Sequence, residues 1–290
     1  MNGQAPTSSA AQRRDRILAL AQEAGLADVA ALSEQFGVTA STVRRDLARL
    51  TAEGLLARTY GGAIALASPV EPSLRHRAAE APAAKRAIAD LAATFVAPGQ
   101  TVFLDAGSTV AGLARALRGA REDATVVTAS LTAVLELGGS GASAGAGAGA
   151  DHTRLTHHIQ LTCLGGTYRP LSNAFVGPLA EAAVERMTFD TAFLSADGVV
   201  PEHGLCEADA EQVRLKEQVA SRARRVYVLA HAAKLGAAPF HAWLPLRPGW
   251  TVLTDAAADP AQLDALRSRG VGVEIGAEVE AEVSRAVPRH

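Results

Sequence analysis

The sequence predicts two domains: a mainly α-helical winged helix-turn-helix domain, followed by an α/β domain with a largely parallel sheet. Three observations support this fold class. Residues 12–52 show helical apolar periodicity, and a short hairpin pattern follows them. From about residue 84 onward, apolar strands alternate with helices, which is typical of a parallel sheet. The length of 290 residues suits two domains better than one.

Composition indicates where the domains meet. Residues 66–83 are rich in alanine and proline, and we expect them to link a first domain, 10–65, to a second, 84–277. Within the second domain, the Gly/Ala/Ser repeat at 138–151 cannot bury enough side-chain area to fix its own structure. We expect this repeat to be a flexible surface insertion, and we assign it no function.

Capping residues delimit the first helices. Residues 12–25 predict a helix that ends at Gly25. Asp28 is suited to cap a second helix, because a side-chain oxygen there can accept amide protons of the first turn. Gly37 permits the tight turn that follows, and Thr39 can cap a third helix. Two short helices joined by such a turn form the helix-turn-helix pattern, whose second helix reads DNA.

The third helix has an apolar face and an arginine-bearing face. Successive residues of a helix turn by about 100°, so Val43, Leu47 and Leu50 share one side. The opposite side carries Ser41, Arg45, Ala48 and Arg49, with Arg44 on the flank. The following segment, LLARTYGGAIAL, predicts a hairpin that turns at Gly61 and Gly62, and this hairpin would be the wing.

Arginine is well shaped to bind phosphates and to bond a guanine edge with two hydrogen bonds. We therefore predict that Ser41, Arg45 and Arg49 approach base edges. Thr42, Arg44 and Arg58 would contact phosphates, and Thr39 completes the predicted DNA-binding set. The competing interpretation is a plain solvated helix face. Residues 1–62 contain seven arginines and six carboxylates, and the chain carries a net charge of -2, so DNA binding would depend on the placement of a few residues.

In the second domain, strands and helices are predicted in alternation. The expected strands are 101–107, 125–130, 158–166, 189–198, 224–230 and 250–257, and the expected helices are 83–96, 108–119, 131–137, 211–223 and 260–270. Ligands of parallel sheets bind beyond the carboxyl ends of the strands, in the loops that lead to helices.

The first such loop predicts an anion site. Asp105 ends a strand, and Gly107, Ser108 and Thr109 lead into a helix. Backbone amides, hydroxyls and the positive helix end together bind anions. The alternative is a capped turn in which the two hydroxyls serve only the helix. The loop is neither GxGxxG nor a Walker sequence, so no dinucleotide or triphosphate is indicated, and we expect no cofactor.

Other polar groups follow the remaining strands or begin the next helices. Each alone is typical of a turn or a surface, but together they suggest a pocket for a small phosphorylated molecule. They are Gly165, Gly166, Tyr168, Arg169, Asp197, Gly198, Glu211, Lys216 and Lys234.

Several classes of site and location are not indicated. His152, His157 and His158 lie near Cys163 without CxxC or HExxH spacing, so we expect no metal site. No Ser-His-Asp order stands out, and no catalytic residue is predicted. Two cysteines indicate a reducing compartment, and the chain shows neither a signal-peptide pattern nor a membrane-length apolar run. We therefore expect a cytoplasmic protein.

The quoted motifs resemble those of a known family. VTASTVRRDLARLTAEGLLARTYGGA resembles the signature of DeoR-type bacterial transcriptional regulators, in which an RRDL block precedes a GGA wing. The second half resembles their sugar-phosphate-sensing domain, which is related in fold to ribose-5-phosphate isomerase. Its matching blocks are, in order, FLDAGST, VVTAS, LGGTYR, VGP, DTAFLSADGV, the helix with Lys216, VYVLAHAAKLG and VLTD.

The resemblance implies a regulator of a sugar or carbohydrate operon and not an enzyme. It would be a repressor that binds double-stranded operator DNA and leaves it when a phosphorylated sugar binds. It also implies a homo-oligomer, either a dimer or a tetramer. The implied effector residues are Asp105, Gly107, Ser108, Thr109, Gly165, Gly166, Asp197, Gly198, Lys216 and Lys234. His231 replaces the family's usual Asp, Ala233 its Ser and Ala129 its Asn, which leaves the identity of the sugar phosphate open.

Two other functions are compatible with the same residues. A sugar-phosphate isomerase with an appended DNA-binding domain would need a carboxylate and a nearby cation for proton transfer. Asp105 or Asp197 with Lys234 could supply them, although the absence of an acid at His231 argues against this function. Alternatively, the second domain only oligomerises.

Overall fold

The computed structural model describes residues 10–24, 27–52, 55–59, 62–65, 71–118, 123–138 and 159–277. The chain divides between Ser73 and Leu74 into two compact units. Of the insertion predicted at 138–151, Gly138 belongs to a helix, and residues 139–151 lie outside the described residues. The turn residues Tyr60 and Gly61 and the three histidines near Cys163 also lie outside them.

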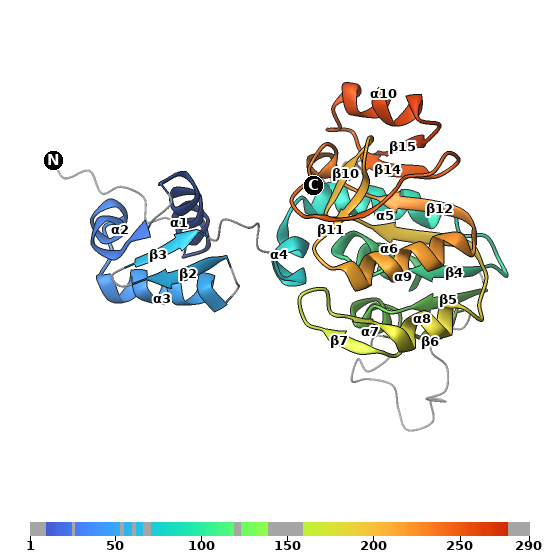
Figure 1. Ribbon diagram of the computed structural model, residues 1–290, viewed down its shortest axis with the longest axis horizontal. Coiled ribbons are helices and arrows are strands. Elements are labelled where there is room, and N and C mark those ends of the chain that lie inside the picture. The colour runs from blue at the N-terminus through green and yellow to red at the C-terminus, as the bar shows by residue number, and fades with distance from the viewer. Residues whose placement is uncertain are drawn as a thin grey trace, which may run out of the picture. The chain divides into compact units, whose positions relative to one another are not determined.

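The N-terminal unit is a winged helix-turn-helix, as predicted (Figure 1). Its elements are α1 (Ala10–Ala24), β1 (Ala27–Asp28), α2 (Val29–Phe36), α3 (Ala40–Ala52), β2 (Leu56–Thr59) and β3 (Gly62–Ala65). Strands β2 and β3 form the predicted antiparallel hairpin, in which Thr59 pairs with Gly62, so Gly62 already belongs to a strand. The short strand β1 adds to the other side of β3. Its two residues are too few for a periodic signal, so it was not predicted.

Local capping explains where the helices of this unit begin and end. The Asp28 carboxylate accepts hydrogen bonds from the amides of Ala30 at 2.8 Å and Ala31 at 3.0 Å. Gly37 ends α2 in the left-handed conformation, with φ of 62°. The predicted cap at Asp28 and the predicted tight turn at Gly37 are therefore confirmed. One apolar core joins the elements and consists of Ile17, Ala21, Leu32, Val43, Leu47, Leu50 and Leu56.

The second unit is built on a seven-stranded sheet whose pairs are all parallel, in the order β15-β14-β12-β9-β4-β5-β6. These strands are β4 (Thr101–Leu104), β5 (Ala124–Thr128), β6 (Ile159–Cys163), β9 (Phe189–Ser195), β12 (Ala223–Leu229), β14 (Thr251–Asp255) and β15 (Gly272–Gly276). The helices are α4 (Leu74–Ala79), α5 (Pro82–Ala93), α6 (Ser108–Arg118), α7 (Leu131–Gly138), α8 (Pro178–Val184), α9 (Ala210–Ser221) and α10 (Pro260–Ser268), with a 3-10 turn at Ala232–Lys234.

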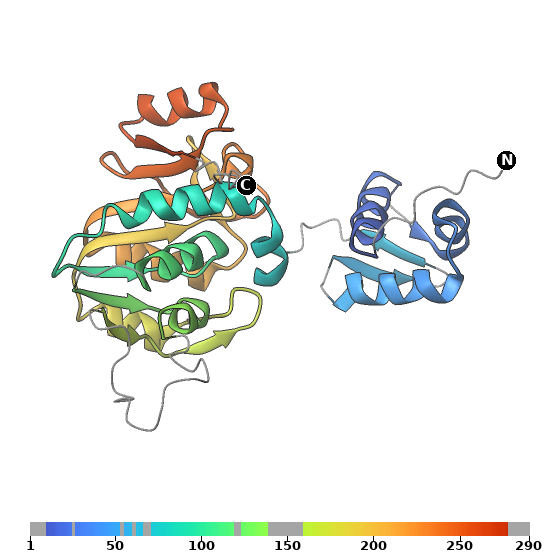
Figure 2. The same ribbon diagram turned by 180° about the vertical axis from the view of Figure 1, so that it is seen from behind.

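Helices cover both faces of this sheet. Helices α8 and α9 lie over the face that Figure 1 shows, and α5, α6 and α7 lie over the face that Figure 2 shows. Alternation along the strands supplies a core to each face. On β4, Phe103 packs into the core on the α8 and α9 side, whereas Val102 and Leu104 pack into the core with α5 and α6. The predicted parallel sheet is confirmed, and the structure adds that helices cover both of its faces.

Two small antiparallel sheets and two helices were not predicted. The sheets pair β7 (Thr167–Arg169) with β8 (Ala174–Val176), and β11 (Gly204–Glu207) with β10 (Gly198–Val200) and β13 (Ala242–Leu244). Their strands are too short for a clear alternation of apolar and polar residues. Helix α4, with six residues, lies within the predicted linker range, and α8 follows β8. Among the residues described, no helix is both long and apolar enough to cross a membrane.

Candidate functional site

The exposed face of α3 carries the predicted reading residues. Val43, Leu47 and Leu50 are buried in the core of the N-terminal unit. Ser41, Arg44, Arg45, Ala48 and Arg49 are exposed. The helix therefore presents three arginines on the side that it does not pack against its own unit. Arg58 lies on β2, opposite Ala63 of β3, and its side chain is outside the described residues.

Three hydroxyl groups gather at the N-terminus of α3. Thr39 Oγ1 lies 2.8 Å from Ser41 Oγ and 3.0 Å from Thr42 Oγ1. It also accepts a hydrogen bond from the Thr42 amide at 3.3 Å. Thr39 is thus the predicted cap of the helix. Hydroxyls at the positive end of a helix suit a phosphate group.

One carboxylate fixes α3 in place, and sequence reasoning did not single it out. Asp46 is buried on the packed side of α3, next to the two exposed arginines. Its carboxylate lies 2.7 Å from Arg13 Nε and 3.7 Å from Arg14 Nη1, both on α1. The sequence feature that could have revealed it is an acidic residue on the side of α3 that otherwise carries apolar residues. Asp46 therefore ties α3 to α1.

We expect Asp46→Asn to destabilise the N-terminal unit by about 2 kcal/mol, because a partly buried charge-assisted hydrogen bond is lost. Hydrogen exchange of the α3 amides in the full chain measures this effect. Asp15→Asn, at an exposed position of α1, is the matched control. Equal protection of α3 in both variants would contradict the assigned role.

In the second unit, the sheet order reverses between β4 and β9. From β4 the chain proceeds to β5 and β6 on one side, and from β9 to β12, β14 and β15 on the other. Parallel sheets bind ligands beyond the strand ends at such a switch point. Asp105 follows β4, and Asp197 follows β9. His231 and Lys234 follow β12 at the same edge.

A buried ion cluster joins the two central strands. Lys216 Nζ lies 3.0 Å from Asp105 Oδ2, donates to Ser195 O at 2.8 Å and pairs with Glu207. Asp105 Oδ2 also accepts hydrogen bonds from the Ser195 amide at 2.8 Å and from its hydroxyl at 3.0 Å. Lys216 is only 1% exposed. Asp105 and Lys216 were predicted to bind an effector, but their polar groups make these contacts with other residues of the protein.

Burial and charge act against each other in this cluster. Burial raises the pKa of Glu207 to about 7, although the adjacent Lys216 ammonium lowers it. Burial by itself lowers the pKa of Lys216, but the carboxylates of Asp105 and Glu207 outweigh burial, and the pKa is raised. Lys216 therefore stays protonated between these carboxylates.

The loop after β4 places Ser108 at the start of α6 and requires a glycine. Gly107 has φ of 148°, and a Cβ atom there would lie 2.8 Å from Ser195 Cβ. Gly166, after β6, has φ of 145°, and a Cβ would lie 2.5 Å from Val176 O. Thr109, which follows Ser108 in α6, is buried. The backbone therefore approaches closely at two of the predicted glycines.

Two cations contact the carboxylate of Asp197. Arg77 Nη1 donates to Asp197 Oδ1 at 2.9 Å, and Lys234 Nζ lies 3.5 Å from the same oxygen. Asp197 Oδ2 is buried and has no hydrogen-bond partner among the residues described. Lys234 also donates to Ala196 O at 2.8 Å. The site thus holds a carboxylate oxygen that a bound hydroxyl could satisfy.

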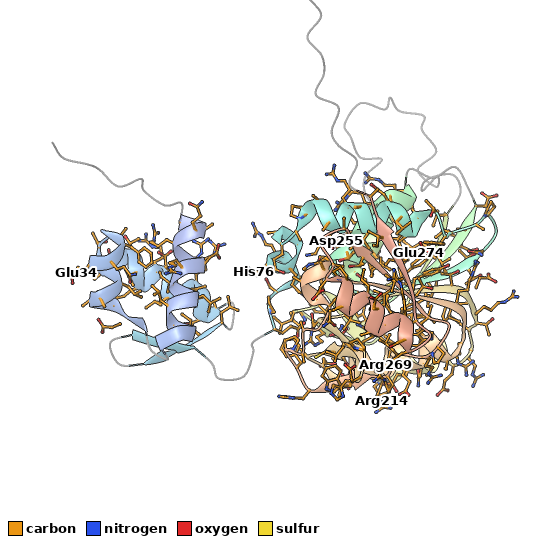
Figure 3. All side chains as sticks on the ribbon, turned by 90° about the horizontal axis from the view of Figure 1, so that it is seen from above. Glu34, His76, Arg214, Asp255, Arg269 and Glu274 are labelled. Carbon is orange, nitrogen blue, oxygen red and sulfur yellow. The ribbon has the colours of Figure 1, made fainter. Side chains whose placement is uncertain are left out.

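Lys85 and His231 interact electrostatically with these cations. Burial lowers the pKa of Lys85 to about 8; Lys234 and Arg77 act in the same direction, and Glu80 opposes them. Burial, Lys85 and Lys234 lower the pKa of His231 to about 4, against the effect of Asp255, which Figure 3 labels. His231 is therefore neutral at pH 7. Its Nε2 is buried without a hydrogen-bond partner in the described part of the chain.

Sequence reasoning missed Arg77 and Lys85. Neither follows a strand, since they come from α4 and α5, which precede the sheet in the chain. Their only sequence signal was a basic residue in an alanine-rich stretch. Both contribute to the same polar region as Ser108, whose hydroxyl lies 3.5 Å from Arg77 O. A pocket of about 400 Å³ between α4, α5, α6 and α7 is lined by both Lys85 and Ser108.

Most of the remaining predicted residues lie on or near β7 and the start of α9. Arg169 Nε lies 3.1 Å from Asp209, which caps α9. The exposed Tyr168 hydroxyl donates to Asn173 Oδ1 at 2.7 Å. Glu211 is exposed on the first turn of α9. Gly165 lies beside Gly166 after β6, and Gly198 begins β10. No group of three or more potential metal ligands occurs among the described residues.

Comparison with known proteins gives matches for both units. Residues 13–68 match the DeoR-like helix-turn-helix domain, and residues 80–256 match the DeoR C terminal sensor domain. The chain is 33% identical over 269 residues to the HTH-type transcriptional regulator GlpR of Haloferax volcanii, covering 92% of this chain and 98% of that protein. It is 29% identical to the lactose phosphotransferase system repressor of Lactococcus lactis, covering 87% and 94%. A ribose 5-phosphate isomerase of Methanocaldococcus jannaschii aligns over 52% of each chain, with a TM-score of 0.34 and 19% identity.

Proposed function

This chain belongs to the DeoR family of transcriptional regulators, and from that premise we propose that it represses a sugar or carbohydrate operon. A phosphorylated sugar bound in the second unit would release the operator. We further propose that the protein acts in the cytoplasm as a homo-oligomer, since two reading helices would fit half-sites one helical turn apart. The repressor assignment is supported by the lactose-system repressor among its relatives.

The DNA-binding part of the proposal rests on the exposed face of α3. Ser41, Arg45 and Arg49 would approach base edges from this face. Arg44, Arg58 and the hydroxyls of Thr39 and Thr42 would contact phosphates, which position the protein without reading sequence. Asp46 would keep the helix at a fixed angle through its contact with α1.

The effector part rests on one observation: two cations, Arg77 and Lys234, contact the Asp197 carboxylate at the switch point of the sheet, and a third, Lys85, donates to the carbonyl oxygen of Arg77. An anion would balance this charge. We assign the phosphate to Lys85, Lys234 and the Ser108 loop, with the amides at Gly107 and Thr109 nearby. Asp197 Oδ2 would accept a hydrogen bond from a hydroxyl group of the sugar.

The other predicted residues take supporting roles in this proposal. Asp105 and Lys216 would position the β4 loop rather than touch the effector, because both are buried in the ion cluster. Gly165, Gly166, Tyr168, Arg169, Gly198 and Glu211 would border the sugar end. The isomerase alternative is not favoured, because the relatives are transcriptional regulators.

Binding to DNA from the protein's own promoter region tests the proposal. We expect the full chain to shift a fragment of that region, and one member of a sugar-phosphate panel to reverse the shift and raise the melting temperature. Retention of the DNA complex with every panel member, or isomerisation of any of them, would overturn the proposed function. The unphosphorylated sugars serve as controls, since they lack the anion that the cations would bind.

The pKa of Lys85 predicts how effector binding depends on pH. An anion binds the protonated ammonium, and the pKa of Lys85 is about 8 because the side chain is buried. We therefore expect the affinity for a phosphorylated sugar to fall roughly tenfold between pH 7 and pH 9, as the ammonium loses its proton. Calorimetric titration of the full chain measures this change. Lys85→Met should bind more weakly at pH 7 and with a flatter pH profile, and an unchanged slope in this variant would contradict the role of Lys85.

A further inference from the structure

Helix α4 makes several polar contacts with the rest of the second unit. It has six residues, LRHRAA, and none of them is buried. A helix this short is not stable alone in water, because nucleation costs more than so few hydrogen bonds return. Figure 3 labels His76 on this helix. The helix therefore depends on the contacts that hold it against the sheet edge.

These contacts involve the residues assigned to the effector. Arg77 Nη1 donates to Asp197 Oδ1 at 2.9 Å, and both side chains are largely buried. The carbonyl oxygen of Arg77 accepts hydrogen bonds from Lys85 Nζ and, at 3.5 Å, from Ser108 Oγ. Arg77 Nη2 and the Leu74 amide both donate to Leu171 O, at 3.1 Å and 3.0 Å. One short helix thus engages the phosphate donors and the sugar acceptor at once.

An anion would compete directly with this arrangement. Lys85 and Ser108 now donate to a neutral carbonyl oxygen, whereas a phosphate oxygen offers a charge-assisted hydrogen bond of about twice the strength. Asp197 would not be left without a cation if Arg77 withdrew, since Lys234 lies 3.5 Å from the same oxygen. A sugar hydroxyl could also donate to Asp197 Oδ2. The contacts that α4 loses can therefore be replaced by contacts to the ligand.

We propose that α4 is a latch that the effector opens: Arg77 holds Asp197 in the effector-free protein, and an anionic ligand that takes Lys85 and Ser108 releases the helix. This inference rests on the proposed function and adds to it the element that responds. Along the chain, α4 is the first helix after the DNA-binding unit. Its release changes the segment through which that unit is attached, so ligand and DNA favour different states of α4, as coupling requires.

Hydrogen exchange of residues 74–80 in the full chain tests the latch. Arg77→Met keeps the aliphatic stem but removes the contacts to Asp197 and Leu171. We expect it to exchange roughly tenfold faster in this segment without any ligand, the factor expected for loss of a charge-assisted hydrogen bond. Arg75→Met is the matched control, because Arg75 is exposed on the same helix. Equal exchange in the two variants would overturn the latch.

A second arm uses ligand and DNA. The sugar phosphate that raises the melting temperature most, or inorganic phosphate if none does, should speed exchange of residues 74–80 in the wild-type chain but not in Arg77→Met, whose latch is already open. Arg77→Met should also bind promoter DNA at least tenfold more weakly than Arg75→Met. Unchanged exchange with ligand, or equal DNA affinity of the two variants, would overturn the latch. Failure of the wild type to bind DNA at all would instead overturn the proposed function, and the exchange experiment would still decide the latch.

Discussion

Replacement of Lys216 by methionine is expected to cost the second unit about 3–5 kcal/mol of unfolding free energy, because it leaves two buried carboxylates without their cation. Lys216 is 1% exposed and contacts both Asp105 and Glu207. Methionine fills a similar volume, so the lost unfolding free energy measures removal of the ammonium charge and not the creation of a cavity. Urea unfolding followed by tryptophan fluorescence measures it, since both tryptophans of the chain, Trp243 and Trp250, lie in the second unit.

Two comparisons separate this effect from a general weakening of α9. Glu217→Met changes the exposed neighbouring position and should cost less than about 0.5 kcal/mol. The double variant Lys216→Met/Glu207→Gln should recover part of the loss, because one uncompensated carboxylate is removed. Burial raises the pKa of Glu207 to about 7, so the folded state binds this proton more tightly than the unfolded state does. Protonation of Glu207 at low pH therefore favours folding. The loss in Lys216→Met should therefore be smaller at about pH 5.5 than at about pH 8, and the opposite trend would contradict the buried-charge explanation.

Replacement of Arg45 by alanine is expected to weaken operator binding by roughly ten- to a hundredfold, the range for loss of a bidentate contact to a base. Arg45 is exposed near the middle of the reading face of α3. Non-specific DNA binding should change much less, because that binding depends on phosphate contacts. Fluorescence anisotropy with the promoter fragment and a scrambled fragment measures the two affinities.

Arg44→Ala provides the contrast within the same helix. If Arg44 contacts a phosphate, its loss should weaken both fragments similarly and lower the salt dependence of binding by about one unit of slope. Helix α3 should keep its fold in both variants, because its packed side consists of Val43, Leu47 and Leu50. Unchanged operator affinity in Arg45→Ala, with an intact circular dichroism spectrum, would remove Arg45 from the reading face.

Much of the fold could be predicted because its signals are local. The stripe of Val43, Leu47 and Leu50 set which side of α3 is buried, and Asp28 and Gly37 bound α2 where a cap and a left-handed turn were expected. The alternation of apolar strands and helices likewise predicted a largely parallel sheet. Short elements such as β1, with two residues, and α4, with six, were not predicted, because so few residues do not show a periodic pattern of apolar positions.

The sites could be predicted only in part. The loops after β4, β9 and β12 were expected to carry polar groups, because the carboxyl ends of parallel strands share one edge. Burial of Lys216 could not be foreseen, since its sequence position on α9 is compatible with an exposed or a buried charge. Its burial depends on the tertiary structure, which brings Asp105 after β4, Ser195 of β9 and Glu207 of β11 into contact with its ammonium group.

By itself, then, the sequence determined the helix-turn-helix, its arginine face, the strand-helix alternation and the family to which the chain belongs. Only the tertiary structure decided which charges meet. Arg77 and Asp197 are 120 residues apart, and Arg13 and Asp46 are 33 apart. Periodicity and capping act within a few turns of chain, whereas such contacts depend on the order in which strands enter the sheet and on the helices that return to its edge. The arginine face of α3 was therefore evident from the sequence, but the contact between Arg77 and Asp197 was not.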